Sequence, residues 1–191
     1  MMIICLTSAN DSGGEPDSSR LDRCLLGIAG EDSRALAELY DCTSASVYAF
    51  ALSILKNTQD AEDVLHDCYL QIYAAASRYQ SFGKPMAWIL TITRNLCLLK
   101  LRERSRTADI PPENWEAYLE ACESASPDDR LVITECMKLL TDEERQIVVL
   151  HAVAGFKHRE TAKLLELPLS TVLSKYNRAI KKLKNHIGKE Y

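Results

Sequence analysis

The stretch that decides the fold is FKHRETAKLLELPLSTVLSKYNRAIKKL, residues 156–183. A short helical pattern, a break at Leu167 and Pro168, and a second helical pattern follow one another without spare residues. This order predicts a helix-turn-helix, a motif whose usual partner is DNA. Apolar residues recur three or four positions apart, so each helix is expected to bury one stripe. The stripe consists of Ala162, Leu165, Val172, Tyr176, Ala179, Ile180 and Leu183.

The second helix of this stretch is basic. Its cations are expected to face away from the buried stripe, where DNA phosphates are their natural counterpart. These cations are Lys175, Arg178, Lys181, Lys182 and Lys184.

The composition describes an ordinary globular chain, with 191 residues of which 47% are hydrophobic and 26% charged. A net charge of −4 argues against a protein that coats nucleic acid through bulk charge. The charge is distributed unevenly, because an acidic segment at 109–135 separates basic segments at 94–106 and after Gly155. This alternation predicts two lobes joined by a linker.

The cysteines form neither a CxxC pair nor a short cluster with histidine, so no metal site is expected. Free thiols among apolar neighbours suit a reducing cytoplasm, and a redox sensor is the lesser alternative. The first residues lack a basic leader, and no apolar run reaches the roughly 20 residues of a membrane span, so neither a signal peptide nor an anchor is expected. The seven cysteines are Cys5, Cys24, Cys42, Cys68, Cys97, Cys122 and Cys136.

Helical periodicity dominates both lobes and no alternating strand pattern competes, so the predicted fold is all-α. Pro85 is expected to precede a helix that continues to Arg102, and Thr141 to cap another helix through its hydroxyl. The predicted domains are a disordered leader at 1–20, a first helical domain at 21–106, an acidic flexible linker at 107–127 and a second helical domain at 128–191.

Three elements follow one another in the chain: DAEDVLHDCYLQIY at 60–73, WILTITRNLCLLKLRERSR at 88–106 and the helix-turn-helix at 156–183. In this order they resemble the sigma factors of bacterial RNA polymerase, in the sigma-70 family and of its two-lobed extracytoplasmic-function type. The first element resembles the helix that binds core polymerase. His66 stands where that family often has Gln. The resemblance and the helical spacing together predict an acidic face for a basic partner. Its residues are Asp60, Asp63, Asp67 and Gln71.

The second element is WILTITRNLCLLKLRERSR, residues 88–106, preceded by the loop RYQSFGKP at 78–85. The helix is similar to the family segment that lies over the minus-ten promoter element and helps to open the duplex. The loop matches the one that captures an unstacked base, and Trp88 is expected in the core. The resemblance therefore implies minus-ten contacts by Arg78, Gln80, Ser81, Arg94, Asn95, Lys100 and Arg102.

The third element is the helix-turn-helix, which in this family approaches the minus-thirty-five element in the major groove. Leu173 takes a place where the family usually has Lys or Arg, and Lys175 replaces the usual Arg, which loses bidentate geometry. By resemblance, DNA contacts are expected from Arg159, Lys163, Thr171, Ser174, Lys175 and Arg178.

The sequence thus predicts a sigma factor with a region 2-like and a region 4-like domain. Its expected partners are core RNA polymerase, promoter DNA and, as the family often uses one, an anti-sigma factor. No catalytic site or cofactor is expected, because the histidines show no ligand spacing and the sequence at Gly83 lacks the pattern of a phosphate loop. Two alternatives remain open: a stand-alone LuxR-like regulator, and a polymerase-docking helical adaptor.

Overall fold

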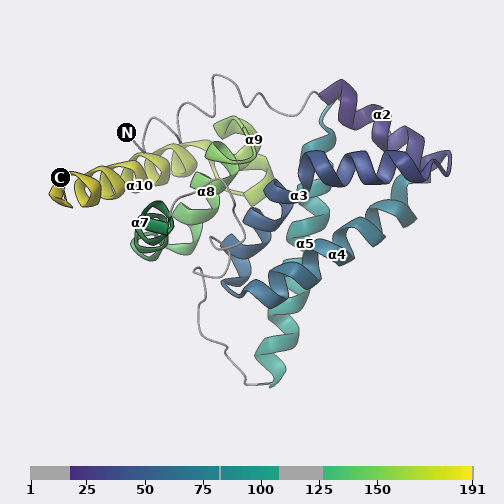
Figure 1. Cartoon of the computed structure of the whole chain (residues 1–191). Helices are drawn as coiled ribbons and strands as arrows, with labels where there is room; N and C mark the ends of the chain where they lie inside the picture. Colours follow the sequence, from purple (N-terminus) through teal and green to yellow (C-terminus); the bar gives the residue numbers. More distant parts are fainter. Residues whose placement is uncertain (1–17, 82, 108–126, 191) are drawn as a thin grey trace.

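The computed structural model describes residues 18–81, 83–107 and 127–190, and all of their regular structure is helical (Figure 1). The all-α prediction is therefore confirmed for these residues. The elements are α2 (Ser18–Ala29), α3 (Ser33–Leu55), α4 (Thr58–Ala75), the 3₁₀ turn η1 (Ala76–Arg78), α5 (Pro85–Thr107), α7 (Pro127–Lys138), α8 (Asp142–Ala152), α9 (His158–Leu165) and α10 (Leu169–Glu190).

The first lobe comprises α2 to α5, with α3 at its centre against the other three helices. Asp32 and Asn57 cap α3 and α4, because their side chains accept hydrogen bonds from backbone amides at the helix starts. The core is apolar and closed to solvent. Its largest fully buried side chains include Leu25, Leu39, Phe50, Ile72 and Ile89.

The second lobe comprises α7 to α10, and α8, α9 and α10 form the predicted helix-turn-helix with its preceding helix. The predicted cap at Thr141 is confirmed: Thr141 and Glu144 form a reciprocal capping box at the start of α8. Helix α9 ends where Glu166 adopts a left-handed conformation with φ of 57°. The turn that follows lets α10 cross the lobe with Val172, Ala179 and Leu183 buried.

The two lobes pack against each other, α3 on α8 and α5 on α9. Between the described residues of the two lobes, ion pairs join Lys56 to Asp142 at 2.8 Å, Lys84 to Glu160 at 2.6 Å and Arg94 to Glu166 at 3.6 Å. Helix α8 lies between α3 and α10, so the basic helix is on the side of the second lobe away from the first (Figure 1).

The observed helices extend beyond several expected limits. Helix α2 begins at Ser18, inside the stretch expected to be a leader, and α5 continues past Arg102 to Thr107. Of the expected linker at 107–127, Thr107 ends α5 and Pro127 begins α7. The rest of that linker and the expected leader before Ser18 lie outside the described residues. Among the described residues, no helix combines the length and apolar composition needed to cross a lipid bilayer.

Candidate DNA and protein interfaces

The expected acidic face on α4 is only partly available. Asp63, Asp67 and Gln71 are exposed, whereas the side chain of Asp60 is only 15% exposed. Asp60 contacts Arg104 and lies 3.5 Å from the Lys100 ammonium, so it ties α4 to α5. The expectation that Asp60 belongs to an open acidic stripe is therefore corrected: it sits at the start of α4, where α5 crosses and supplies two cations.

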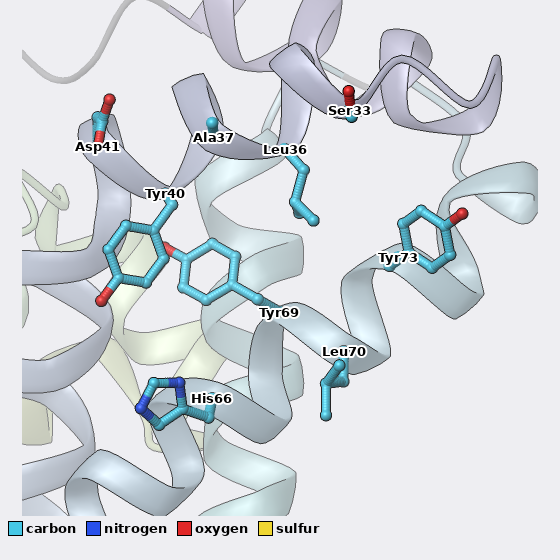
Figure 2. A pocket seen from close by; sticks show the side chains of 9 residues that line it. All are labelled: Ser33, Leu36, Ala37, Tyr40, Asp41, His66, Tyr69, Leu70 and Tyr73. Carbon is cyan, nitrogen blue, oxygen red and sulfur yellow. The ribbon is translucent and has the colours of Figure 1, made fainter.

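An apolar groove lies beside these carboxylates, between α3 and α4 (Figure 2). Its volume is about 740 Å³, and Leu70 on its α4 side is 69% exposed. The Tyr69 hydroxyl donates to Thr43, whose own hydroxyl donates to the Leu39 carbonyl, and burial raises the pKa of Tyr69. The groove is lined by Ser33, Leu36, Ala37, Tyr40, Asp41, His66, Tyr69, Leu70 and Tyr73.

Sequence reasoning missed the apolar part of this surface. Leu70 and Tyr73 interrupt an otherwise polar helix face, since the buried stripe of α4 runs through Val64, Cys68 and Ile72. Their off-stripe position was the signal that could have found them. A protein interface usually combines such apolar side chains with a polar rim.

The loop before α5 is fixed to α2 by Asp22. The hydroxyls of Tyr79 and Ser81 both donate to its carboxylate, the second at 2.8 Å. Burial, followed by the hydrogen bond to Asp22, raises the pKa of Tyr79. Gly83 has a φ of 70°, a left-handed conformation that glycine adopts without strain. Phe82 lies outside the described residues.

A small cavity of about 200 Å³ opens beside this loop. The Tyr79 ring lies 4.9 Å from that of Trp88, which is half-buried, so Trp88 belongs both to the core edge and to the cavity wall. This volume is below the usual range of about 300–1,000 Å³ for small-molecule sites and suits a single planar group. The lining residues are Arg78, Tyr79, Gln80, Lys84 and Trp88.

The expected minus-ten contacts on α5 are not gathered into one surface. Asn95 and Arg102 are exposed, and they lie two turns apart on one face of the helix. Arg94 instead reaches Glu166 of the second lobe. Lys100 donates to Asp63 at 2.7 Å, so its charge is held against α4.

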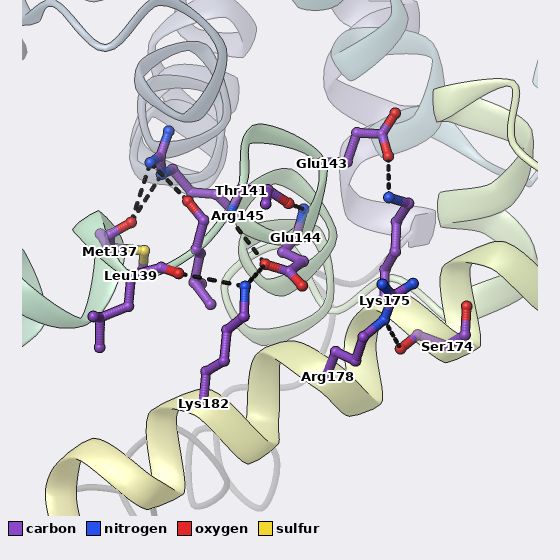
Figure 3. A network of polar contacts seen from close by, with 11 residues as sticks. Met137, Leu139, Thr141, Glu143, Glu144, Arg145, Ser174, Lys175, Arg178 and Lys182 are labelled. Carbon is purple, nitrogen blue, oxygen red and sulfur yellow. Dashed lines mark hydrogen bonds and ion pairs between the residues drawn. The ribbon is translucent and has the colours of Figure 1, made fainter.

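On α10, two of the cations expected to face outward are turned toward α8 (Figure 3). Lys175 pairs with Glu143 at 2.5 Å, and Lys182 pairs with Glu144 at 2.6 Å. The expectation for these two lysines is corrected because α8 brings the acids of its first turn alongside α10. The carboxylate of Glu144 has a lowered pKa: burial opposes this shift, and the hydrogen bond from Lys182 and the Thr141 amide outweigh it.

The remaining candidates of the helix-turn-helix are accessible. Arg159 and Lys163 are exposed on α9, and Ser174 and Arg178 are exposed on α10. The Arg178 guanidinium donates to the Ser174 carbonyl at 3.3 Å and so lies along its own helix (Figure 3). Thr171 is half-buried beside them.

Two family models match the chain, one for each lobe. Sigma-70 region 2 matches residues 39–107, and Sigma-70, region 4 matches residues 130–183. The ECF RNA polymerase sigma factor SigK of Mycobacterium tuberculosis (strain ATCC 25618 / H37Rv) is 32% identical over 178 residues, with 88% of this chain and 94% of SigK covered. This chain belongs to the sigma-70 family, in its extracytoplasmic-function class.

One further relative and two solved structures are similar to this sigma factor. SigK of Mycobacterium sp. (strain KMS) is 28% identical, with 88% of this chain and 91% of the relative covered. Among solved structures, CnrH in complex with the cytosolic domain of CnrY has a TM-score of 0.61 at 22% identity, covering 90% of this chain and 99% of CnrH. RpoE in complex with the anti-sigma factor NepR from Bartonella quintana has a TM-score of 0.66 at 21% identity, covering 80% of this chain and 96% of RpoE.

Cys24, Cys42, Cys68 and Cys97 of this sigma factor are free thiols, and the described residues contain no cluster of side chains that could hold a metal ion. Cys68 and Cys97 are fully buried. Burial raises the pKa of Cys68 to about 11, so its thiol stays protonated and unreactive. Cys5 and Cys122 lie outside the described residues.

Proposed function

We propose that the two lobes of this sigma factor divide the work of promoter-directed initiation. As a sigma factor, the protein directs RNA polymerase in transcription initiation, in the cytoplasm where the polymerase acts. The observation that carries the division is that each lobe matches one sigma region, in family order. The first lobe would bind core polymerase and open the minus-ten element, and the second would read the minus-thirty-five element.

The polymerase contact is assigned to the exposed side of α4. Asp63 and Asp67 are exposed carboxylates that can pair with a basic partner. In the neighbouring groove, the exposed side chains of Leu70 and Tyr73 can make apolar contacts with it. Apolar side chains at the centre of an interface supply most of its affinity, whereas exposed charges mainly steer the encounter. Asp60 acts indirectly here, by holding Lys100 and Arg104 on α5.

The minus-ten contact is assigned to the loop and to α5. The cavity beside Tyr79 and Trp88 would receive an unstacked base, because aromatic rings and polar side chains surround it. Arg78 and Gln80 line that cavity, while Asn95 and Arg102 extend the surface along α5.

The minus-thirty-five contact is assigned to α10, the second helix of the helix-turn-helix. Such a helix enters the major groove with its first residues against base edges. Ser174 and Arg178 are exposed there, and Arg159 and Lys163 of α9 are placed for backbone phosphates.

An anti-sigma factor is a further proposed partner. The RpoE relative is described in complex with the anti-sigma factor NepR, and its fold resembles this one. The apolar groove on α4 is a surface for which such a partner would compete with polymerase. Co-purification of a helical partner that prevents polymerase association would support this.

The test measures association with core polymerase and transcription from genomic fragments. We expect polymerase-dependent starts, and we expect Asp67→Ala combined with Leu70→Ala to lower both association and transcription about tenfold or more, since interface anchors carry about 2 kcal/mol or more. The matched control is Leu26→Ala combined with Glu135→Ala, because Leu26 is 55% exposed on α2 and Glu135 is exposed on α7. Sequence-specific DNA binding without polymerase association would instead indicate an independent regulator.

A further inference from the structure

The outer face of α10 carries an exposed leucine that the buried stripe does not explain. Leu173 is 39% exposed, although it directly follows the fully buried Val172. Its neighbours on this face, Ser170 and Asn177, are both exposed and polar. The apolar face of α10 is already covered by α8 and α9, and Leu173 lies at the edge of that face with part of its side chain open to solvent.

Asn177 lies one turn beyond Leu173 on the same face. Within the described residues its side-chain amide makes no hydrogen bond, in contrast to Arg178, which donates to Ser174. The side-chain amide of an asparagine can donate hydrogen bonds from its nitrogen and accept them at its oxygen. The Cα atoms of Leu173 and Asn177 lie about 6 Å apart along the helix axis. This spacing lets the two side chains reach base pairs that are one or two steps apart in the duplex.

The cations around this pair favour DNA as the occupant. Arg178, Lys181 and Lys184 are exposed on the outer side of α10, and the first lobe lies against α8 rather than against this face. Lys175, in contrast, is held by Glu143 of α8 at 2.5 Å, so its ammonium is drawn toward α8 and away from a DNA duplex bound on this face. A basic surface with one apolar and one amide side chain at its centre matches the major groove, where thymine offers a methyl group and adenine offers N6 and N7.

We propose that Leu173 and Asn177 are specificity-determining residues of the minus-thirty-five contact: Leu173 reads a thymine through its 5-methyl group, and Asn177 reads a neighbouring adenine through two hydrogen bonds. The proposal rests on the proposed function of α10. It replaces the expectation that Leu173 merely weakens phosphate contact. A leucine in place of a Lys or Arg removes a charge, but its apolar side chain can distinguish thymine from the other bases.

The experiment uses the full-length protein with core polymerase, on a promoter from which the wild type initiates and whose upstream element is randomised. The distribution of transcribed sequences is compared between variants. We expect Leu173→Ala to lose preference for thymine at one position, and Asn177→Ala to lose preference for adenine at a neighbouring position by about fivefold or more. Leu173→Met, which keeps an apolar contact, should retain the thymine preference.

Matched controls exist for both substitutions. Leu139→Ala removes a leucine that is 42% exposed on another surface, and Asn185→Ala removes an exposed asparagine further along α10. Both should leave base preferences unchanged. Lys181→Ala should weaken all sequences uniformly, as expected for a phosphate contact.

Replacing the selected thymine by deoxyuridine removes only the methyl group. This should lower wild-type initiation about fourfold, the value of one buried methyl, and leave Leu173→Ala unaffected. Unchanged preferences in both alanine variants would overturn the inference while leaving the sigma function intact. A wild type that initiates on no genomic fragment would overturn the proposed function and the inference with it.

Discussion

At the scale of single residues, the second lobe contains a half-buried pair of stacked imidazoles. His158 lies 4.6 Å from His151, ring centre to ring centre, and both rings contact Tyr176 of α10. His151 donates from Nδ1 to the Phe156 carbonyl, whereas Nδ1 of His158 is buried without a hydrogen bond among the described residues. Burial, and then the neighbouring His151, lowers the pKa of His158. The pair therefore packs α10 best when His158 is neutral.

This geometry predicts a loss of stability in mild acid. An unfolded histidine binds a proton near pH 6.5, whereas folded His158 does so only at lower pH. Its stabilising contribution is thus complete above about pH 6.5 and is lost as pH falls from there toward the folded pKa. Urea unfolding at pH 7.5 and 5.5 should show a larger loss of unfolding free energy for the wild type than for His158→Gln. Equal losses in the two proteins would contradict this assignment.

At the scale of elements, the first turn of α8 is bonded both to its own capping residue and to α10. The Glu144 carboxylate accepts from the Thr141 amide at 2.9 Å and from Lys182 of α10 at 2.6 Å. The cap that begins α8 therefore also holds the basic helix in place. Arg145, which is buried beside it, donates to the Met137 and Leu140 carbonyls and closes the end of α7.

Removal of this cap should be measurable. Thr141→Ala deletes the hydroxyl that accepts from the Glu144 amide, and we expect it to lower the unfolding free energy by about 1 kcal/mol. Thr141→Ser, which retains the hydroxyl, is the matched control and should stay close to wild type. Thermal unfolding followed by circular dichroism gives both values. An alanine variant as stable as the wild type would show that the Thr141 hydroxyl of the capping box contributes nothing to the unfolding free energy.

The helices themselves were largely predictable, because apolar spacing and capping residues are local signals. Thr141 and the acids after it marked the start of α8 correctly, and Pro85 marked α5. The sequence did not reveal which charges meet across helices. Lys175 and Glu143 are far apart in the chain, and only the crossing of α8 and α10 brings them together. For the same reason Asp60 was expected at the surface, although α5 covers it.

At the scale of the whole molecule, the lobes are held together by both apolar packing and ion pairs. The apolar part lies between α3 and α8, and the ion pairs flank it. Exposed pairs are worth about 0–1 kcal/mol each, so the closed arrangement is only moderately stabilised by charge. Buried side chains of both lobes belong to one apolar cluster, so more than these ion pairs joins the lobes.

Neutralising the three acids of these pairs should loosen the arrangement. We expect Asp142→Asn combined with Glu160→Gln and Glu166→Gln to increase the radius of gyration, measured by small-angle X-ray scattering. The control Glu135→Gln alters an acid whose ion pair stays within α7. An unchanged radius would mean that the apolar contact of α3 with α8 suffices to hold the lobes together.

The pairing of basic side chains with carboxylates also changes how salt should act on promoter binding. Arg94, Lys175 and Lys182 already have protein carboxylates as neighbours. A DNA phosphate that replaces such a carboxylate releases a condensed cation from the DNA, but the freed carboxylate takes up a cation in turn. Each such exchange contributes less counterion release than a contact by an unpaired cation. The logarithm of DNA affinity should therefore fall less steeply with the logarithm of salt concentration than the number of basic residues suggests.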